Sequence, residues 1–137
     1  MPEKGIEKIL DDKGRILAII GNTKEMEGKS NFITPDYFGF QTVVQNINEE
    51  DYFKAHEHKP FDKIDSLSAQ EFIYVIRGEL NIGIYSGKER ITERKLEEGD
   101  FIILNSGHDI IGLKKPTQFI LIKQGPYRGE GEKIFLK

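Results

Sequence analysis

Short apolar runs recur along the chain, and their composition predicts β-strands because they are rich in Ile, Val, Phe and Tyr. Each run is bounded by Gly, Pro, Asn or Asp, and none has the 3.6-residue periodicity of a helix, apart from one short turn predicted within 34–38. Many strands at close spacing predict an all-β fold, an antiparallel sandwich or barrel. The predicted strands are 15–20, 39–47, 71–85, 100–105 and 118–124.

Three glycines mark the turns between these runs. The segment YSGKER (85–90) predicts a hairpin tip in which Gly87 takes a positive φ, followed by the strand-like RITERKL. The segment LEEGD (96–100) predicts a second tight turn, in which Asp100 caps the turn at Gly99. Gly78 ends the run that begins with EFIYVIR. These glycines therefore divide the second half of the chain into successive strands.

Composition adds limits to this picture. The chain has 137 residues, enough for one domain over 1–137 with a core of its own. The net charge of −3 argues against a nucleic-acid surface, and no apolar stretch approaches the length of a membrane helix. Without cysteine, disulfides and thiolate chemistry are excluded. The charged N-terminal segment does not read as a signal peptide, so we expect a cytoplasmic protein.

Two of the three histidines are one residue apart, at His56 and His58. On a strand, such neighbours point to the same face, so both imidazoles could bind one metal ion. On a helix the same spacing would turn them apart. An isolated His-x-His pair is more often a surface accident, and both interpretations stay open on this pair alone.

Glu71 begins the apolar run of 71–85, on the same face as Ile73 and Val75. A carboxylate on the buried face of a strand needs a partner, either a metal cation or a hydrogen-bonding network. By the same parity, Tyr74 is expected to point away from Glu71 into the core or an interface.

The third histidine, His108, follows the strand of 100–105 and shares the parity of Ile102 and Leu104. We therefore expect its side chain to face inward. Other polar side chains carry weaker signals: Gln45 is expected to make a structural hydrogen bond, and Tyr85 and Lys123 to pack or lie at the surface.

These residues resemble the two sequence motifs of the cupin superfamily. In the first motif, His-x-His is followed by Glu and, after six intervening residues, by Gly; here these are His56, His58, Glu71 and Gly78. The second motif begins at Gly99 and reaches, after five residues, Asn105-Ser106-Gly107-His108. The later LIKQGPY is similar to a branch of small single-domain cupins with GGH in the second motif, a branch often associated with surface-sugar biosynthesis.

The resemblance implies a cupin jelly-roll barrel of two antiparallel sheets, usually a homodimer. The barrel core would cover about 40–125, with an N-terminal strand and the C-terminal tail packed on it. The twelve residues between the second histidine and the glutamate would form a loop over the barrel mouth. The third histidine comes two residues before its usual position, where this chain has Ile110, and a shift of two keeps the facing of the side chain. The implied metal ligands are His56, His58, Glu71 and His108.

This nitrogen and oxygen ligand set suits a divalent ion such as Zn, Mn, Fe or Ni. The resemblance implies a metal-binding protein with a small polar ligand, a sugar derivative or a carboxylic acid. It leaves open an enzyme of isomerase, epimerase or dioxygenase type, a non-catalytic binding or sensor module, and a barrel without metal. No catalytic residue outside the ligand set is identified, and neither nucleic acid nor membrane is an expected partner.

Overall fold

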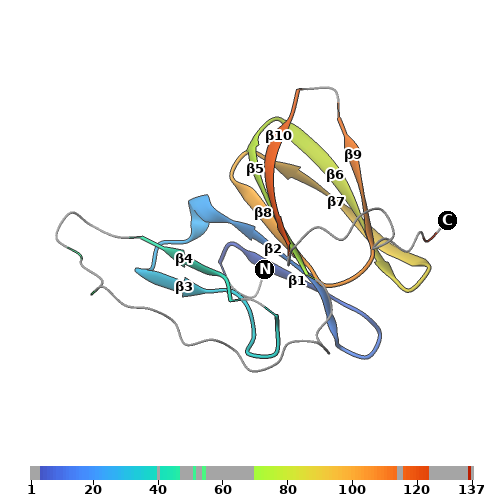
Figure 1. Cartoon of the computed structure of the whole chain (residues 1–137), viewed down its shortest axis with the longest axis horizontal. Helices are drawn as coiled ribbons and strands as arrows, with labels where there is room; N and C mark the ends of the chain where they lie inside the picture. The colour runs from blue at the N-terminus through green and yellow to red at the C-terminus, as the bar shows by residue number, and fades with distance from the viewer. Residues whose placement is uncertain are drawn as a thin grey trace.

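The computed structural model describes residues 4–39, 41–46, 51, 54, 70–113, 116–123 and 136. The predicted all-β class is confirmed, and one short 3₁₀ turn is the exception among these residues (Figure 1). The elements are β1 (Ile6–Leu10), β2 (Ile16–Asn22), η1 (Thr23–Glu25), β3 (Ser30–Phe32), β4 (Val43–Gln45), β5 (Glu71–Arg77), β6 (Glu79–Ser86), β7 (Glu89–Glu97), β8 (Asp100–Leu104), β9 (His108–Gly112) and β10 (Gln118–Lys123).

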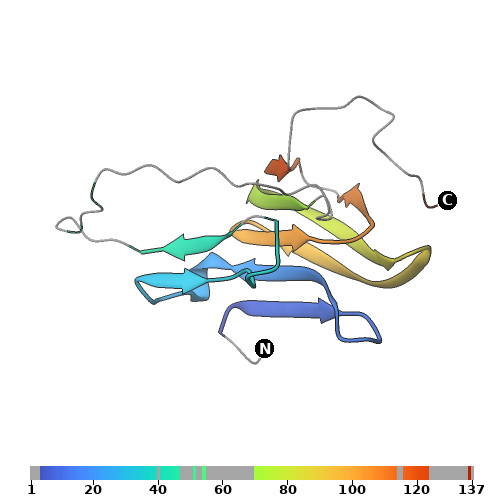
Figure 2. The same ribbon diagram turned by 60° about the horizontal axis from the view of Figure 1, so that its bottom comes forward.

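The strands form three sheets, and each pair is antiparallel. A five-stranded sheet has the order β1-β2-β8-β5-β10, a three-stranded sheet has the order β7-β6-β9, and β3 pairs with β4. The five-stranded sheet lies between the other two in Figure 1, and Figure 2 shows it from below. Within the described ranges the sheets stay separate and do not close into a barrel.

The main core fills the space between the five-stranded and three-stranded sheets. Along β6, Leu80, Ile82 and Ile84 are fully buried, and the polar positions between them face the other way. This alternation is the period of two that places every second side chain on one face. Facing them across the core are residues of four strands of the larger sheet: Ile9, Ala18, Ile20, Ile73, Val75, Ile102 and Leu104.

The five-stranded sheet is also covered on its other face. Phe101 and Ile103 pack there with Met26, Ile33 and Phe38, which belong to the β3–β4 layer and its connections. A strand covered on both faces needs apolar residues at consecutive positions, which explains the unbroken runs in β2 and β8. The molecule therefore has three layers where the sequence predicted two.

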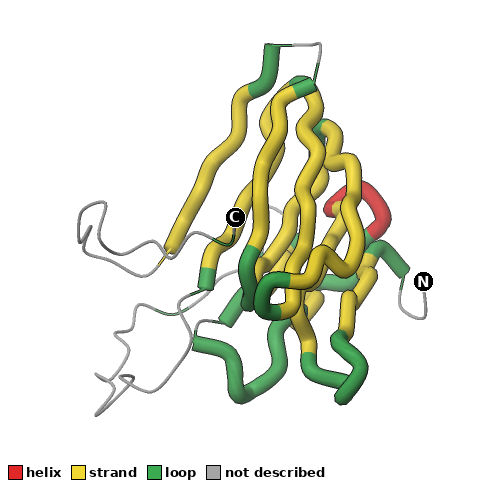
Figure 3. Tube along the Cα trace, turned by 90° about the vertical axis from the view of Figure 1, so that its right-hand side faces the viewer, coloured by secondary structure: helices red, strands yellow, loops and turns green. Residues whose placement is uncertain are grey.

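The predicted turns are confirmed. Gly78, Gly87 and Gly99 have φ of 83°, 59° and 89°, in the left-handed region that favours glycine. Asp100 caps the β7–β8 turn, since its Oδ2 accepts a hydrogen bond of 2.8 Å from the backbone N–H of Glu97. The chain crosses between the two large sheets at Gly78, again at the β7–β8 turn, and twice more after β8 and β9. Figure 3 shows several long strands lying side by side with their axes roughly aligned.

The strand predictions were correct in outline and wrong at several ends. Among the described residues of the run at 39–47, Val43–Gln45 form a strand, and Gly78 divides the run at 71–85 into β5 and β6. The sequence analysis missed β1, β3 and β9, which are short strands whose partners lie far away or across a turn. The segment 34–38 is a turn, in which the N–H of Phe38 donates to the carbonyl of Pro35 at 3.1 Å.

The loop predicted between the second histidine and Glu71 lies outside the described residues, apart from Gln70. The same is true of the C-terminal tail after Lys123, except for Leu136, whose Cδ1 would lie 2.6 Å from a Cβ added at Gly107. In the part of the chain that is described, no helix is long and apolar enough to cross a membrane.

Candidate functional site: the Glu71–His108 pair

Glu71 is the first residue of β5, where it pairs with Leu104 of β8. Its face of the strand continues with Ile73 and Val75, which are fully buried between the two large sheets. The predicted inward facing of Glu71 is therefore confirmed, and its side chain is 17% exposed. Tyr74 packs on the opposite face of the sheet, as its parity predicted.

His108 is the first residue of β9, which belongs to the three-stranded sheet. Its partner across the ladder is Ile84, a core residue, and residues directly opposite each other in an antiparallel pair share a face. His108 therefore faces inward, as predicted. Ile110 pairs with Ile82 and has the same facing, so the shift of two from the usual cupin position does preserve the side of the strand.

The two side chains meet across the gap between the sheets. Nε2 of His108 lies 2.9 Å from Oε2 of Glu71, and both side chains are mostly buried, 26% and 17% exposed. The other ring nitrogen, Nδ1, lies 3.2 Å from the backbone carbonyl oxygen of Ser106. Since a carbonyl only accepts, Nδ1 carries a proton and donates it. The ring is thus held by one oxygen on each side.

This environment shifts the charge state of the imidazole. Burial is the largest single effect and lowers the pKa of His108, because a charged ring is poorly solvated there, whereas the hydrogen bonds to Glu71 and to the Ser106 carbonyl raise it. The negative charges of Glu71 and Asp109 act in the same direction. The net result is a pKa above the ordinary value of 6.5, so the metal-free pair favours an imidazolium beside a carboxylate.

The raised pKa predicts how the stability of the metal-free protein depends on pH. Because the folded state binds this proton more tightly than the unfolded chain, the contribution of the pair is fully present below pH 6.5, the ordinary value. The contribution is then lost as pH rises through the folded pKa. The test compares the free energies of unfolding of wild type and His108→Gln, measured with urea in the presence of a chelator. We expect the difference between the two proteins to become smaller as the pH rises from 5.5 to 8.5, roughly the titration range of histidine.

Because other groups titrate as well, only the difference between the two proteins is interpreted. A difference that stays flat or grows over this pH range would contradict the pairing of His108 with Glu71 in solution.

Gln70 and Asn105 were not expected from the sequence to interact. Their side chains are hydrogen-bonded to each other next to the Glu71–His108 pair. Gln70 is 3% exposed, and its side chain accepts a hydrogen bond from the N–H of Gly39 and donates one to Asn105 Oδ1, each 2.8 Å long. Asn105 in turn donates to the carbonyl of Ile16 at 3.1 Å. These hydrogen bonds hold Gln70, which directly precedes Glu71, and Asn105, which precedes the turn that leads to His108. The sequence alone could not show that Gln70 and Asn105 are hydrogen-bonded to each other, because the two residues are distant in the chain.

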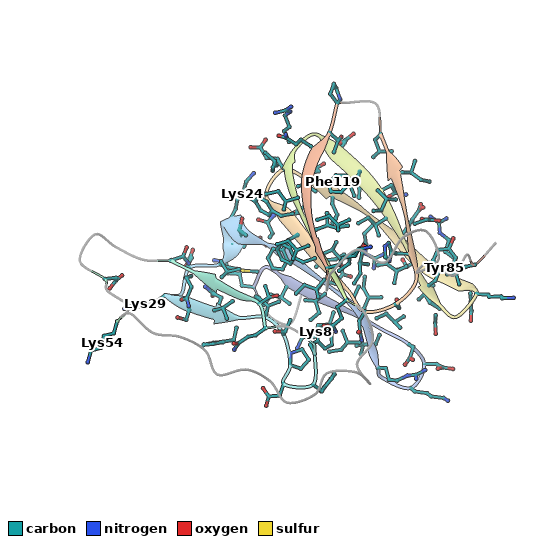
Figure 4. All side chains as sticks on the ribbon, viewed as in Figure 1. Lys8, Lys24, Lys29, Lys54, Tyr85 and Phe119 are labelled. Atoms are coloured by element: carbon teal, nitrogen blue, oxygen red, sulfur yellow. The ribbon has the colours of Figure 1, made fainter. Side chains whose placement is uncertain are left out.

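Two other polar residues have structural roles, as predicted. Oε1 of Gln45 accepts a hydrogen bond of 2.6 Å from the hydroxyl of Ser30, across the β3–β4 pair. Tyr85, near the β6–β7 hairpin in Figure 4, is 3% exposed and donates its hydroxyl to Asp109 Oδ2 at 2.9 Å. It faces the outer side of the three-stranded sheet with Asp109, away from the Glu71–His108 pair.

His56 and His58 lie outside the described residues. The described part of the chain contains no group of three or more His, Cys, Asp or Glu residues that could hold a metal ion. It brings together two of the four predicted ligands, Glu71 and His108, from two different sheets. Comparisons with models of protein families, with curated proteins and with solved structures find no match to this chain.

Proposed function

We propose that this protein is a metal-binding cupin with a jelly-roll fold, and that it binds or acts on a small polar metabolite at a divalent ion between its two large sheets. The proposed ligands are His56, His58, Glu71 and His108. The observation that carries the proposal is the 2.9 Å contact between Nε2 of His108 and Oε2 of Glu71 on the inward face. Both residues also belong to the two segments of the sequence that resemble the cupin motifs.

The separation of the two atoms fits a shared ion. Zinc bonds to imidazole nitrogen and carboxylate oxygen are both about 2.0–2.2 Å long, so neighbouring ligands of one tetrahedral ion lie roughly 3.3–3.6 Å apart, somewhat more than the 2.9 Å between Nε2 and Oε2. The pair needs only small side-chain movements to admit an ion between Nε2 and Oε2. Direct ion pairing without metal explains the same distance, so metal content has to decide between the two.

The tautomer of His108 also favours this interpretation. A histidine that binds a metal through one nitrogen commonly donates its other N–H to a carbonyl or carboxylate, which fixes the ring. In this site the Ser106 carbonyl takes that position at 3.2 Å from Nδ1, and Nε2 is directed toward Glu71. Binding an ion would require Nε2 to lose its proton, so metal and proton compete for the site.

The strand order supports a jelly roll, in which two antiparallel sheets are built by Greek-key crossings. β6 and β7 form the central hairpin, β5 pairs with β8 in the opposite sheet, and β9 returns to pair with β6. Among the described strands, β9 pairs with β6 alone.

A bound ion with open coordination positions would supply Lewis-acid, hydroxide-generating or oxygen-binding chemistry. An isomerase, an epimerase and a dioxygenase are each compatible with these ligands, acting on a sugar derivative or a carboxylic acid. The second candidate is a non-catalytic binding or sensor module in which the same ion anchors the small molecule. We propose a homodimer in either case.

The test is elemental analysis of untagged protein purified without chelator. We expect near-stoichiometric divalent metal in wild type and in the control Glu98→Gln, which removes a carboxylate from the exposed β7–β8 turn. His56→Ala and Glu71→Gln should each lower the metal content at least about ten-fold, because each removes a ligand.

Equal metal content in all four proteins would contradict the proposed ligands. Absence of metal from the wild type, even after incubation with Zn²⁺, Mn²⁺, Fe²⁺ or Ni²⁺, would leave a metal-free scaffold with a structural Glu–His ion pair. If the wild type does bind metal, a turnover assay of the metal-loaded protein with a panel of metabolites separates an enzyme from a non-catalytic binding module.

A further inference from the structure

The strand β10 lies at the edge of the five-stranded sheet but has the composition of an inner strand. Its four central residues, Phe119–Ile122, are all apolar and alternate between the two faces of the sheet. Such an unbroken apolar run is typical of strands covered on both faces, as in β2 and β8 of the same sheet. Among the described strands, however, β10 pairs with β5 alone.

The apolar side chains of β10 are exposed on both faces of the sheet. On the inward face, Phe119 packs on the main core, whereas Leu121 is 42% exposed (Figure 4). On the outer face, Ile120 and Ile122 are 47% and 56% exposed, opposite two partly buried aromatic residues of β5. Lys123, at the end of the strand, is exposed, as expected from the sequence. Neighbouring exposed apolar side chains of this kind mark interaction surfaces.

The other outer strands of the two large sheets carry charged residues. β1 contains Glu7 and Lys8, six of the nine residues of β7 are charged, and β9 contains Asp109. The guanidinium of Arg94 in β7 also lies 3.0 Å from Oε2 of Glu7, which joins two of these edges. Charged side chains on an edge strand discourage pairing with another chain, and the apolar centre of β10 has none.

A second copy of the chain is complementary to this edge. Residues opposite each other in an antiparallel pair share a face, so a two-fold axis has to pass through a residue of β10. With the axis at Leu121, Ile120 of each copy lies opposite Ile122 of the other, and the irregularity between Gln118 and Phe119 stays outside the pair. The lysines at the two strand ends are then about 13 Å apart along the strand, so like charges do not face each other.

We propose that β10 is the interface of a homodimer, in which two copies pair antiparallel along this strand and their five-stranded sheets become one continuous sheet. The pairing covers the outer isoleucines and the inward leucine of both copies. The inference rests on the homodimer of the proposed function and names its surface, and it does not require a bound ion.

The test is sedimentation equilibrium of the full chain, first in a chelator and then after loading with Zn²⁺. The wild type should be a dimer in both. Ile122→Lys should raise the Kd of the dimer about a hundred-fold or more, because it places a charge opposite an apolar residue and the two-fold axis introduces this change twice. The matched control is Leu10→Lys, which adds the same charge at a residue 47% exposed on β1, the other edge of the same sheet. It should remain a dimer.

Two double variants test the register. In Ile120→Glu/Ile122→Lys, each introduced carboxylate lies opposite an introduced ammonium group of the other copy, so dimerisation should recover relative to Ile122→Lys. In Ile120→Lys/Ile122→Lys, like charges face each other, and the protein should be a monomer.

Hydrogen–deuterium exchange of the wild type gives a readout that needs no variant, in case Ile122→Lys fails to fold. The amides of 119–122 should become more protected as the protein concentration rises, and those of β1 should not. Protection of 119–122 that is independent of concentration would overturn the inference, since another part of the same chain would then cover β10.

Three sedimentation results would also overturn it. They are a wild type that is monomeric at roughly 100 µM, a hundred-fold above a micromolar Kd, a dimer that Ile122→Lys leaves intact, and an equal loss in Leu10→Lys. A monomer that binds metal contradicts the interface alone, whereas a β10 dimer that takes up no metal contradicts the proposed metal site alone.

Discussion

Replacing His108 with alanine is expected to weaken divalent metal binding by about a hundred-fold or more, since even the loss of a residue that only orients a ligand costs 10–100-fold. The variant removes the imidazole whose Nε2 lies 2.9 Å from Oε2 of Glu71. The measurement is a competition titration of chelator-stripped protein against a metal-binding dye. The circular dichroism spectrum should stay that of the wild type, because His108 lies at the start of β9 and outside the two apolar clusters.

A second variant tests where the imidazole has to be. Ile110 occupies the usual cupin position, faces the same side as His108 and lies two residues further along β9. Two residues span about 6.5 Å of strand, more than a side-chain adjustment can recover. We therefore expect the double variant His108→Ala/Ile110→His to remain as weak as His108→Ala. Full recovery of the metal affinity would mean that the ion binds near residue 110 of β9 and not between Glu71 and His108.

Gly21→Ala is expected to destabilise the fold by about 3 kcal/mol, the upper end of the usual cost of overpacking a core. Gly21 pairs directly with Phe101, and a Cβ at this position would overlap the Cζ and Cε2 atoms of the Phe101 ring. The ring is 1% exposed and stacks on Phe72 with centroids 5.5 Å apart, so it cannot move aside without displacing further core residues. Thermal unfolding should show a melting temperature lower by roughly 10 °C.

Gly112→Ala is the matched control, because it makes the same substitution at a glycine within a strand, the last residue of β9. A Cβ at Gly112 would meet no atom within 4 Å. We expect its melting temperature to stay within about 2 °C of wild type, as for most surface substitutions. Equal melting temperatures for Gly21→Ala and Gly112→Ala would show that Phe101 does not pack over Gly21 in solution.

Both predictions depend on features that the sequence reveals to different degrees. The inward facing of Glu71 and His108 followed from parity alone, because side chains alternate strictly along a strand and each residue follows or begins an apolar run. The packing of Phe101 over Gly21 could not be predicted in this way. It depends on the register between β2 and β8, whose residues are about eighty positions apart in the chain.

The third layer was not predicted for a related reason. The continuous apolar runs in β2 and β8 are compatible with burial on both faces, but they do not say which segment covers the second face. That segment is the region of Met26, Ile33 and Phe38, in which polar and apolar residues are mixed without a clear period.

The sequence by itself determined the all-β class, the turns at Gly78, Gly87 and Gly99, and the facing of Glu71 and His108, because these follow from local steric preferences and from the two-residue period of a strand. The tertiary structure alone decided the strand order, the third layer and the 2.9 Å contact of His108 with Glu71. These features arise from pairing and packing between segments distant in the chain. Local conformational preferences cannot encode such contacts, because a contact between distant segments contributes to stability only when the fold has brought both segments together.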